Sequence, residues 1–533
     1  PDSLIGDGSA AVGIFPIFSE VGGIHTSRSK TVEITAPEGY TVRYTTDGSI
    51  PTKRSKAYTE PIQIAVDRGD GEVIRAACFD ADGKLTGQVI THTYISADST
   101  EGLHYTVMLS CDEDDLKAMY RDVHAKVERA AHAEILAPDG TRIISQDVGL
   151  RLFGGSSRAL PQKSFKIIAR KDGYFGDEPY VGLGTFTYPF FPERTVISGK
   201  NAGKVLEKYD GLILRNGGND ALLSTAADPD RPTLLRDGIS NEFIAKYAPN
   251  VQMSYAHFAV VYLNGEYRGV YLLCEQTQMN RGRVDIPEKA DGDTSLEHGY
   301  LMIGVGGQAD EPELITIPID LNITDRTGQT RYYHSINFTL SGGTYTEEQK
   351  AYVTRYVSGV FKVLGKAIYE NEYYTLHRDG RLTPKRSFEW AVTDEEKQIE
   401  TISAVFNLES AVSMCILDEI CKNLDAMAFN MYVDLSPEGD GVLTLAAQLG
   451  FEVEEKKIAI DEIFADIKSG KCTEAFGTGT AAVISPVGKL RYVDEVMTIN
   501  GGQIGELSQK LYDTITGIQT GKLEDPRGWR VTV

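Results

Sequence analysis

Residues 148–170 read VGLRLFGGSSRALPQKSFKIIAR, and this stretch decides the fold around it. Apolar residues alternate with small or polar ones up to Leu152, a pattern typical of a half-buried strand. The glycines and serines at 154–157 predict a flexible turn, and residues 163–168 predict a return strand. The stretch therefore predicts a hairpin whose loop can wrap an anion, because backbone N–H groups of a Gly/Ser turn can point inward.

Four basic residues accompany this hairpin, Arg151, Arg158, Lys163 and Lys166, in a chain with a net charge of −22. They are consistent with a phosphate cradle, but also with an ordinary exposed hairpin whose cations are solvated. The residues alone favour the exposed hairpin. The acidic balance argues against nucleic acid or an anionic membrane as the main partner.

The composition is that of a soluble globular chain, with 41% hydrophobic and 24% charged residues over 533 positions. This length allows three or four domains. Charge or glycine interrupts every long apolar run, so no transmembrane helix is expected. The six cysteines form no CxxC pair and the nine histidines no HExxH motif, which predicts buried free thiols and argues against a zinc hydrolase.

Several secondary-structure signals are specific. Asn264-Gly265 between β-prone arms predicts a hairpin with a two-residue type I′ turn. Thr346 with Gln349 predicts a capping box at the start of a helix over residues 342–369. A second helix is predicted over residues 408–423, with Val412 and Cys415 among its buried residues.

Residues 148–170 also resemble the signature of the spore-coat CotH kinase family, in which G-x-SSR, a proline and K-S-[YF]-K follow in this order. Three further blocks come in the family's order: LLRDGISNEFIAKY (234–247), VVYLNGEYRGVYLLCEQ (260–276) and NLDAMAFNMYVD (423–434). Four ordered blocks are far more specific than any one of them. The resemblance implies an atypical kinase fold that moves phosphate from ATP to Ser or Thr hydroxyls of a protein substrate.

The same resemblance implies an ATP site at the hairpin. The residues that it assigns to ATP are Ser156, Ser157, Arg158, Lys163, Lys166 and Glu275. Glu275 ends the return strand of the second hairpin, where it would orient a phosphate-binding lysine, as in the lysine–glutamate pair of protein kinases. A surface glutamate on a hairpin is the equally open alternative.

Asp425 and Asn430 have the spacing of the catalytic aspartate and the magnesium-binding asparagine in the protein-kinase catalytic loop. A turn residue at a helix end is the alternative for Asp425, but the ordered blocks favour the catalytic assignment. The family's W-D-x-D segment, which completes its Mg²⁺ site, is absent after Asp434. Asp434 and Asp440 are near enough to replace it, with Asp434 assigned as the metal ligand, although both also fit turn or strand-end positions. Impaired transfer is expected.

Residues 14–98 contain short β-prone runs separated by turns, and YTTDGSIPT (44–52) with VIRAACFDADG (73–83) resembles the chitobiase/β-hexosaminidase C-terminal-type domain. The resemblance implies a β-sandwich found on surface and secreted proteins, acting as a spacer or as a weak platform for surface carbohydrate. It implies a bacterial cell-surface or extracellular location. Asp47 is expected to cap a turn.

Residues 445–533 resemble the C-terminal part of class IV branched-chain amino-acid aminotransferases, most specifically in EAFGTGTAAVISPVG (474–488). The resemblance implies that Gly479, Thr480 and Ala481 are the remnant of a site for the phosphate of pyridoxal phosphate (PLP) and the substrate carboxylate. The family's Schiff-base lysine precedes this region, and nothing upstream resembles it. PLP is therefore expected only if another chain completes the site, and no transaminase activity is expected of the tail alone.

The sequence thus predicts an α+β multidomain chain: a linker (1–13), a β-sandwich (14–98), an atypical kinase-like α+β domain (103–442) and a truncated aminotransferase-like α/β tail (445–533). A CotH-like ATP-dependent protein kinase is the first functional hypothesis. A branched-chain aminotransferase, which would be cytoplasmic, and a non-catalytic surface-binding protein are the alternatives. A native fusion and an artefact of sequence assembly both fit the junction at 442–445.

Overall fold

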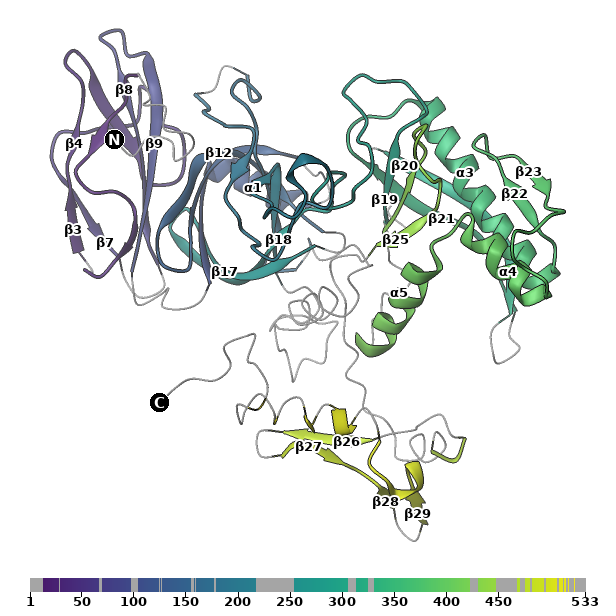
Figure 1. The fold of residues 1–533 in the computed structure, drawn as a ribbon. Helices are drawn as coiled ribbons and strands as arrows, with labels where there is room; N and C mark the ends of the chain where they lie inside the picture. Colours follow the sequence, from purple (N-terminus) through teal and green to yellow (C-terminus); the bar gives the residue numbers. More distant parts are fainter. Residues whose placement is uncertain are drawn as a thin grey trace. The chain divides into compact units, whose positions relative to one another are not determined.

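Strands dominate the described part of the chain, and a few helices accompany them (Figure 1), which confirms the α+β prediction. The computed structural model describes residues 13–27, 29–66, 70–96, 104–123, 125, 127–154, 158, 160–176, 179–216, 254–304, 313–324, 330–421, 430–446, 467–469, 475–479, 482–492, 495–505, 508–510, 512–513, 516 and 522. The chain divides into two compact units, residues 1–454 and 455–533, and each is described by itself.

The first unit begins with short strands that match the β-rich prediction for this part: β1 (Ile17–Phe18), β2 (Gly23–His25), β3 (Ser29–Val32), β4 (Ile34–Thr35), β5 (Thr41–Thr45), β6 (Lys56–Ala57), β7 (Ile62–Ala65), β8 (Glu72–Phe79) and β9 (Leu85–Ser96). Five of them form a sheet in the order β2-β9-β8-β5-β6, while β1 pairs with β4 and β3 with β7. Val32, Ile64 and Ile74 belong to the buried core of this part. Asp47 caps its turn as predicted, since its Oδ1 accepts hydrogen bonds from the backbone N–H and hydroxyl of Ser49.

A closed seven-stranded barrel follows, which the sequence did not predict. Its elements, with one helix, are β10 (Tyr105–Cys111), α1 (Glu113–Arg121), β11 (Arg129–Leu136), β12 (Arg142–Leu152), β13 (Phe165–Ile168), β16 (Gly211–Arg215), β17 (Ala256–Leu263) and β18 (Glu266–Glu275). The strand order is β10-β11-β12-β13-β16-β18-β17, and the parallel pairing of β10 with β17 closes the barrel. Leu150, Ile167, Leu212 and Leu273 are fully buried members of its core.

Both predicted hairpins of the barrel are confirmed. Strands β12 and β13 pair antiparallel around the 154–157 region, and β17 pairs with β18 around Asn264-Gly265. Asn264 and Gly265 have φ values of 52° and 83°, as a type I′ turn requires. The Asn264 side chain also accepts a hydrogen bond from the Cys111 N–H and donates one to the Cys111 carbonyl, so this turn is attached to the end of β10.

An excursion between β13 and β16 contains β14 (Phe186–Thr187), the 3₁₀ helix η3 (Gly199–Asn201) and β15 (Lys208–Tyr209). The second half of the unit is a five-stranded sheet in the order β20-β21-β19-β24-β25, with helices packed on it (Figure 1). Its elements are β19 (Gly299–Gly304), β20 (Leu314–Thr324), β21 (Thr330–Ser341), α3 (Glu347–Gly365), the π-helix η5 (Lys366–Glu370), β22 (Tyr374–Leu376), β23 (Leu382–Pro384), α4 (Asp394–Ser403), α5 (Leu408–Cys421), β24 (Asn430–Asp434) and β25 (Thr444–Ala446). Strand β25 pairs with β24, so this sheet extends past residue 442, where the sequence placed the end of the domain.

The capping box of α3 is confirmed, because Thr346 Oγ1 accepts from the Gln349 N–H and the Gln349 side chain accepts from the Thr346 N–H. The predicted buried face of α5 is wrong at two positions. Val412 is 57% exposed and Cys415 is exposed, whereas Ser410 and Met414 are buried. Apolar residues occur all around α5, so its sequence pattern did not determine which face is buried.

The buried-thiol prediction is confirmed for Cys78, Cys111 and Cys274 and is wrong for Cys415. Within the described ranges, no helix is long and apolar enough to cross a membrane.

The second unit contributes two hairpins and a short 3₁₀ helix to the described residues: β26 (Phe476–Gly479), β27 (Ala482–Pro486), β28 (Lys489–Tyr492), β29 (Glu495–Thr498) and η6 (Asn500–Gly502). Strand β26 pairs with β27, and Gly479 stands opposite Ala482. Gly479 therefore ends a strand, as expected for a residue entering a turn. Thr480 and Ala481 lie outside the described residues.

Candidate functional site

The hairpin of β12 and β13 places two cations side by side. Arg151 is the direct cross-strand partner of Lys166. Their neighbours along the strands, Leu150 and Ile167, belong to the barrel core, and side chains alternate between the two faces of a strand. Arg151 and Lys166 therefore lie together on the outer face of the barrel. Like charges directly opposite each other in a sheet repel, so the pair requires a counter-charge.

The one acid that acts on both cations is Glu128, and it is already engaged. Its carboxylate accepts two hydrogen bonds from Arg170, at 2.7 and 2.6 Å. Gly149 makes this approach possible, because a Cβ at that position would lie 1.9 Å from Glu128 Oε1. Among the described residues, neither the Arg151 nor the Lys166 side chain donates a hydrogen bond.

The electrostatics of Lys166 follow from this surplus of positive charge. The pKa of its amine is lowered to about 7, first by burial and then by the guanidiniums of Arg151 and Arg170, while Glu128 opposes them. Burial likewise lowers the pKa of Arg151. A bound anion would relieve the repulsion and favour the charged amine, so the pair has the chemistry of an anion site.

The loop adds a third and a fourth cation near the pair. Arg158 is buried, and its carbonyl accepts a hydrogen bond of 2.9 Å from Lys163 Nζ. Burial lowers the pKa of Lys163. Ser156 and Ser157 lie outside the described residues.

An apolar strip continues from the cation pair across the outer face. Ile213 stands opposite Lys166, and Cys274 stands opposite Ile213. These two residues form one buried cluster with Leu272, against which Phe153 packs. The cation pair therefore lies beside a buried apolar cluster.

Glu275 does not orient a lysine here, and it is not a surface residue, so both sequence interpretations need correction. Its side chain is fully buried at the end of β18. Oε1 accepts from Arg194 Nε and Nη2 at 2.9 and 2.5 Å and from the Tyr255 N–H at 2.9 Å. Oε2 accepts from Arg283 Nε at 2.9 Å.

Strand register explains why Glu275 and Lys166 are apart. Glu275 stands opposite Leu212, which stands opposite Ile167, so the glutamate lies on the inner face. Lys166 lies in the neighbouring row on the outer face. Glu275 instead connects β18 to two segments outside the barrel, those of Arg194 and Arg283.

The predicted metal ligands lie at opposite ends of β24. Asn430 begins the strand and Asp434 ends it, about 13 Å apart at the usual rise per residue. Asn430 Oδ1 accepts from the Gly304 N–H, and Asp434 Oδ1 accepts from the Ser436 N–H. One ion cannot contact both side chains, so these two residues do not fit a shared Mg²⁺ site. Asp425 lies outside the described residues.

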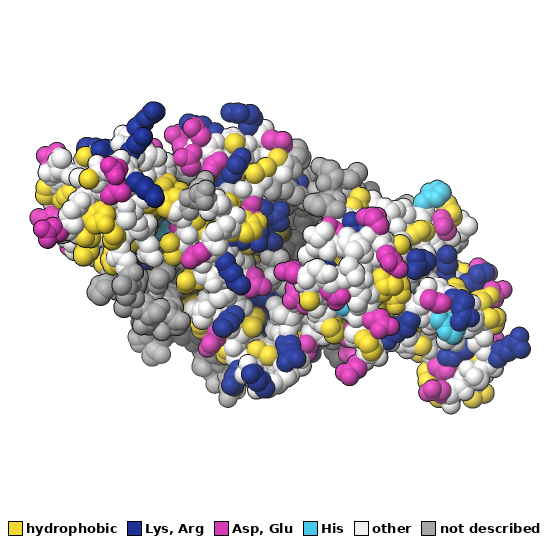
Figure 2. Space-filling view, turned by 90° about the horizontal axis from the view of Figure 1, so that it is seen from above, with side chains coloured by type: hydrophobic (Ala, Val, Ile, Leu, Met, Phe, Trp, Pro, Cys, Tyr) yellow, Lys and Arg dark blue, Asp and Glu magenta, His cyan; other side chains and the backbone are white. Residues whose placement is uncertain are grey.

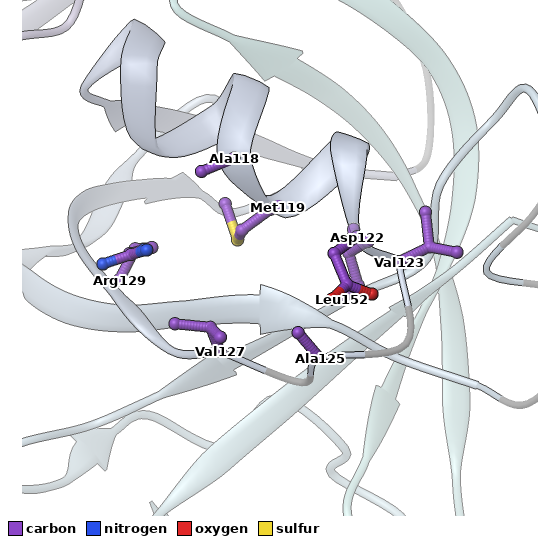
Figure 3. Close-up of a pocket in the computed structure, with 8 residues that line it drawn as sticks. All are labelled: Ala118, Met119, Asp122, Val123, Ala125, Val127, Arg129 and Leu152. Atoms are coloured by element: carbon purple, nitrogen blue, oxygen red, sulfur yellow. The ribbon is translucent and has the colours of Figure 1, made fainter.

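A small hollow lies next to the hairpin, between α1, the segment that follows it and the end of β12 (Figure 3). Met119, Val127 and Leu152 line it. Its volume of about 30 Å³ is far below the roughly 300–1,000 Å³ of a typical ligand pocket, so it cannot hold a nucleotide. Acidic and basic side chains are interspersed on the face in Figure 2.

Comparisons with known proteins match two parts of the chain to families. Residues 21–91 match the family described as Chitobiase/beta-hexosaminidase C-terminal domain, and residues 150–302 match the family described as CotH kinase protein. The chain thus contains a CotH kinase family domain whose match begins inside β12 and includes the cation pair.

Curated relatives add a second similarity. A stretch of 92 residues is 58% identical to a probable branched-chain-amino-acid aminotransferase of Staphylococcus aureus (strain N315), covering 17% of this chain and 26% of the relative. Branched-chain-amino-acid aminotransferase 2 of Bacillus subtilis (strain 168) is 54% identical over 94 residues, covering 18% and 26%. The chain spans about a quarter of the length of these relatives.

Among solved structures, the Bacteroides ovatus mixed-linkage glucan utilization locus SGBP-B in complex with a mixed-linkage heptasaccharide covers 63% of this chain and 93% of its own. It is 10% identical, and its TM-score of 0.12 is too low to carry an argument.

Proposed function

We propose that this chain, which carries a CotH kinase family domain, is an ATP-dependent phosphotransferase acting on Ser or Thr hydroxyls of proteins at a bacterial cell surface. The observation that carries the proposal is the Arg151–Lys166 pair, two partly buried cations with a single engaged acid nearby. In this assignment the pair holds the triphosphate, and Lys163 and Arg158 flank it.

The domain division is part of the proposal. The strands of residues 14–98 act as a spacer or a weak carbohydrate platform, residues 103–442 act as the kinase, and residues 445–533 are a remnant of an aminotransferase. In this division Gly479, at the end of β26, is the one described member of the predicted phosphate turn. Pyridoxal phosphate would bind only if another chain completes that site.

Replacing Lys166 by methionine should weaken ATP binding by the full chain at least tenfold, because a charge-assisted contact contributes about 1.5–3 kcal/mol. Arg151→Gln should have a similar effect. Isothermal titration calorimetry measures both. Lys171→Met is the matched control, since Lys171 is an exposed lysine just beyond the same strand. Equal affinities for wild type, Lys166→Met and Lys171→Met would remove the pair from the site.

ATP binding should also take up a proton at Lys166. Its pKa of about 7 leaves the amine largely neutral near pH 8, and a bound triphosphate favours the charged form. Affinity should therefore fall as the pH rises from about 6.5 to about 8.5. Calorimetry in buffers of different ionisation enthalpy would detect the proton uptake, and Lys166→Met should abolish its lysine component. Identical apparent enthalpies in all buffers near pH 8 would contradict this coupling.

A further inference from the structure

The strands before residue 97 dock on the outer face of the barrel through a contact that we call the seam, formed by β8 and β9 on one side and β11 and β12 on the other. Apolar side chains pack along its border: Ile24, Ile95, Met108, Leu136, Val260 and Tyr262. Backbone groups join across it too, because the Gly71 N–H donates to the Gly265 carbonyl at 2.7 Å. The N-terminal strands are therefore in direct contact with the barrel.

Buried charges lie in the middle of the seam, and they balance. Arg75 on β8 pairs with Asp147 on β12 at 3.9 Å. Arg142 and Glu134, on β12 and β11, pair at 3.4 Å. Both carboxylates have further partners, since Glu134 Oε2 accepts from the Thr93 N–H and Asp147 Oδ2 from the Val181 N–H. Two guanidiniums thus meet two carboxylates, and Glu134 Oε1 makes no hydrogen bond to a described residue.

Two histidines share this space, and the geometry fits their neutral forms. His132 Nδ1 lies 2.8 Å from Asp147 Oδ1, and its Nε2 lies 3.3 Å from Ser145 Oγ. Neutral His132 can donate to Asp147 and accept from the Ser145 hydroxyl. This is the connectivity of a charge-relay triad, but the three side chains lie across two paired strands under the seam, where their contacts fix the tautomer of His132.

His92 on β9 is the second histidine. Its Nδ1 is buried, lies 3.8 Å from Glu134 Oε1 and makes no hydrogen bond to a described residue. The ring meets Phe18 edge-on at a centroid distance of 4.8 Å. The imidazole is thus packed between the Phe18 ring and the Glu134 carboxylate. The acid beside each histidine also pairs with a guanidinium, Glu134 with Arg142 and Asp147 with Arg75.

We propose that the seam is an acid-sensitive catch, in which protonation of His92 loosens the N-terminal strands from the barrel while both parts stay folded. A proton on His92 adds a buried positive charge beside a carboxylate that already pairs with Arg142. The proposal is independent of the kinase assignment, since it uses none of the groups of the cation pair.

Every charged or titratable group that faces His92 enters this balance. They are Tyr94 from the N-terminal strands, His132 and Glu134 from β11, and Arg142 from β12, with Glu20, His25 and Lys30 at the edge. Burial lowers the pKa of His92, Glu134 opposes this, and Arg142 and His132 add to it. A histidine released from the seam binds a proton more readily, so the undocked form gains population as the pH falls below about 6.5.

Hydrogen–deuterium exchange of the full chain, followed by mass spectrometry and corrected for intrinsic exchange rates, tests the catch at about pH 7.5 and about pH 5. The reporters are peptides containing the Thr93 and Gly71 N–H groups, both of which bond across the seam. We expect at least tenfold faster opening of these amides at the lower pH, with helix α3 equally protected at both. Equal reporter protection at the two pH values would overturn the proposal, and so would parallel loss of protection in α3, which would mean global acid unfolding.

Variants separate the histidines from other acid effects. His92→Gln with His132→Asn should abolish most of the pH dependence of the reporters, whereas His334→Gln should leave it unchanged, because the side chain of His334 is 79% exposed. His92→Gln alone provides a milder variant if the double one folds poorly, since His92 loses no hydrogen bond to a described residue, and it should reduce the dependence. Unchanged pH dependence in both His92 variants would overturn the proposal.

Discussion

Replacing Glu275 by alanine is expected to lower the free energy of unfolding by about 3–5 kcal/mol, the usual cost of removing one partner from a buried ion pair. Glu275 is fully buried and accepts hydrogen bonds from Arg194 and Arg283. Without the carboxylate, both guanidiniums keep their charge, because arginine does not deprotonate in proteins. Each also stacks on a tyrosine ring, Arg194 on Tyr255 and Arg283 on Tyr209, so neither can easily move into water.

Urea unfolding of the full chain, followed by fluorescence, measures this loss. Glu266→Gln is the matched control, because Glu266 begins the same strand, is 62% exposed and pairs only with Arg268 among the described residues. Its substitution should change stability by less than about 1 kcal/mol. A Glu275→Ala protein as stable as Glu266→Gln would show that the buried cluster does not hold the two outer segments to the barrel.

Asp425→Asn is expected to lower phosphotransfer by about 10²–10⁴-fold, the usual contribution of a positioned general base. In the proposed function its carboxylate accepts the proton of the Ser or Thr hydroxyl as that oxygen attacks the terminal phosphate. Asparagine keeps the size of the side chain but cannot take the proton. ATP affinity should stay within about threefold of wild type, because the phosphate-binding cations are elsewhere.

Transfer of labelled phosphate to a mixed protein substrate measures the rate, and calorimetry measures the affinity. Asp379→Asn is the control, since Asp379 is an exposed turn residue whose Oδ1 accepts from the Arg381 N–H. An undiminished rate in Asp425→Asn would show that another group is the base. Equal loss in Asp379→Asn would point to a general effect of removing surface charge.

Local signals in the sequence predicted much of the fold. The Asn264-Gly265 turn and the Thr346–Gln349 capping box were confirmed because each depends on a few adjacent residues and on backbone geometry. The hairpin of β12 and β13 was confirmed for the same reason. Its register also makes Arg151 and Lys166 direct partners, and a register assignment from the alternation alone would have found this pair.

Long-range features were not predictable in this way. Arg194 precedes Glu275 by 81 residues, and no spacing connects them in the sequence. Barrel closure depends on the parallel pairing of β10 with β17, which leaves no local signal. The face of α5 that is buried depends on which side the sheet covers, so Val412 was misassigned.

The closure of the barrel has a consequence for synthesis on the ribosome. Tyr105 on β10 pairs with Ala259 on β17, so the first strand must wait for about 150 further residues before it gains its second neighbour. At about 5–20 residues per second, this wait is on the order of ten seconds. The N-terminal strands dock partly on β17 and its turn, so their seam is also incomplete during that time. A nascent chain that stalls in this interval exposes a strand edge and an apolar face together, which makes it a substrate for chaperones.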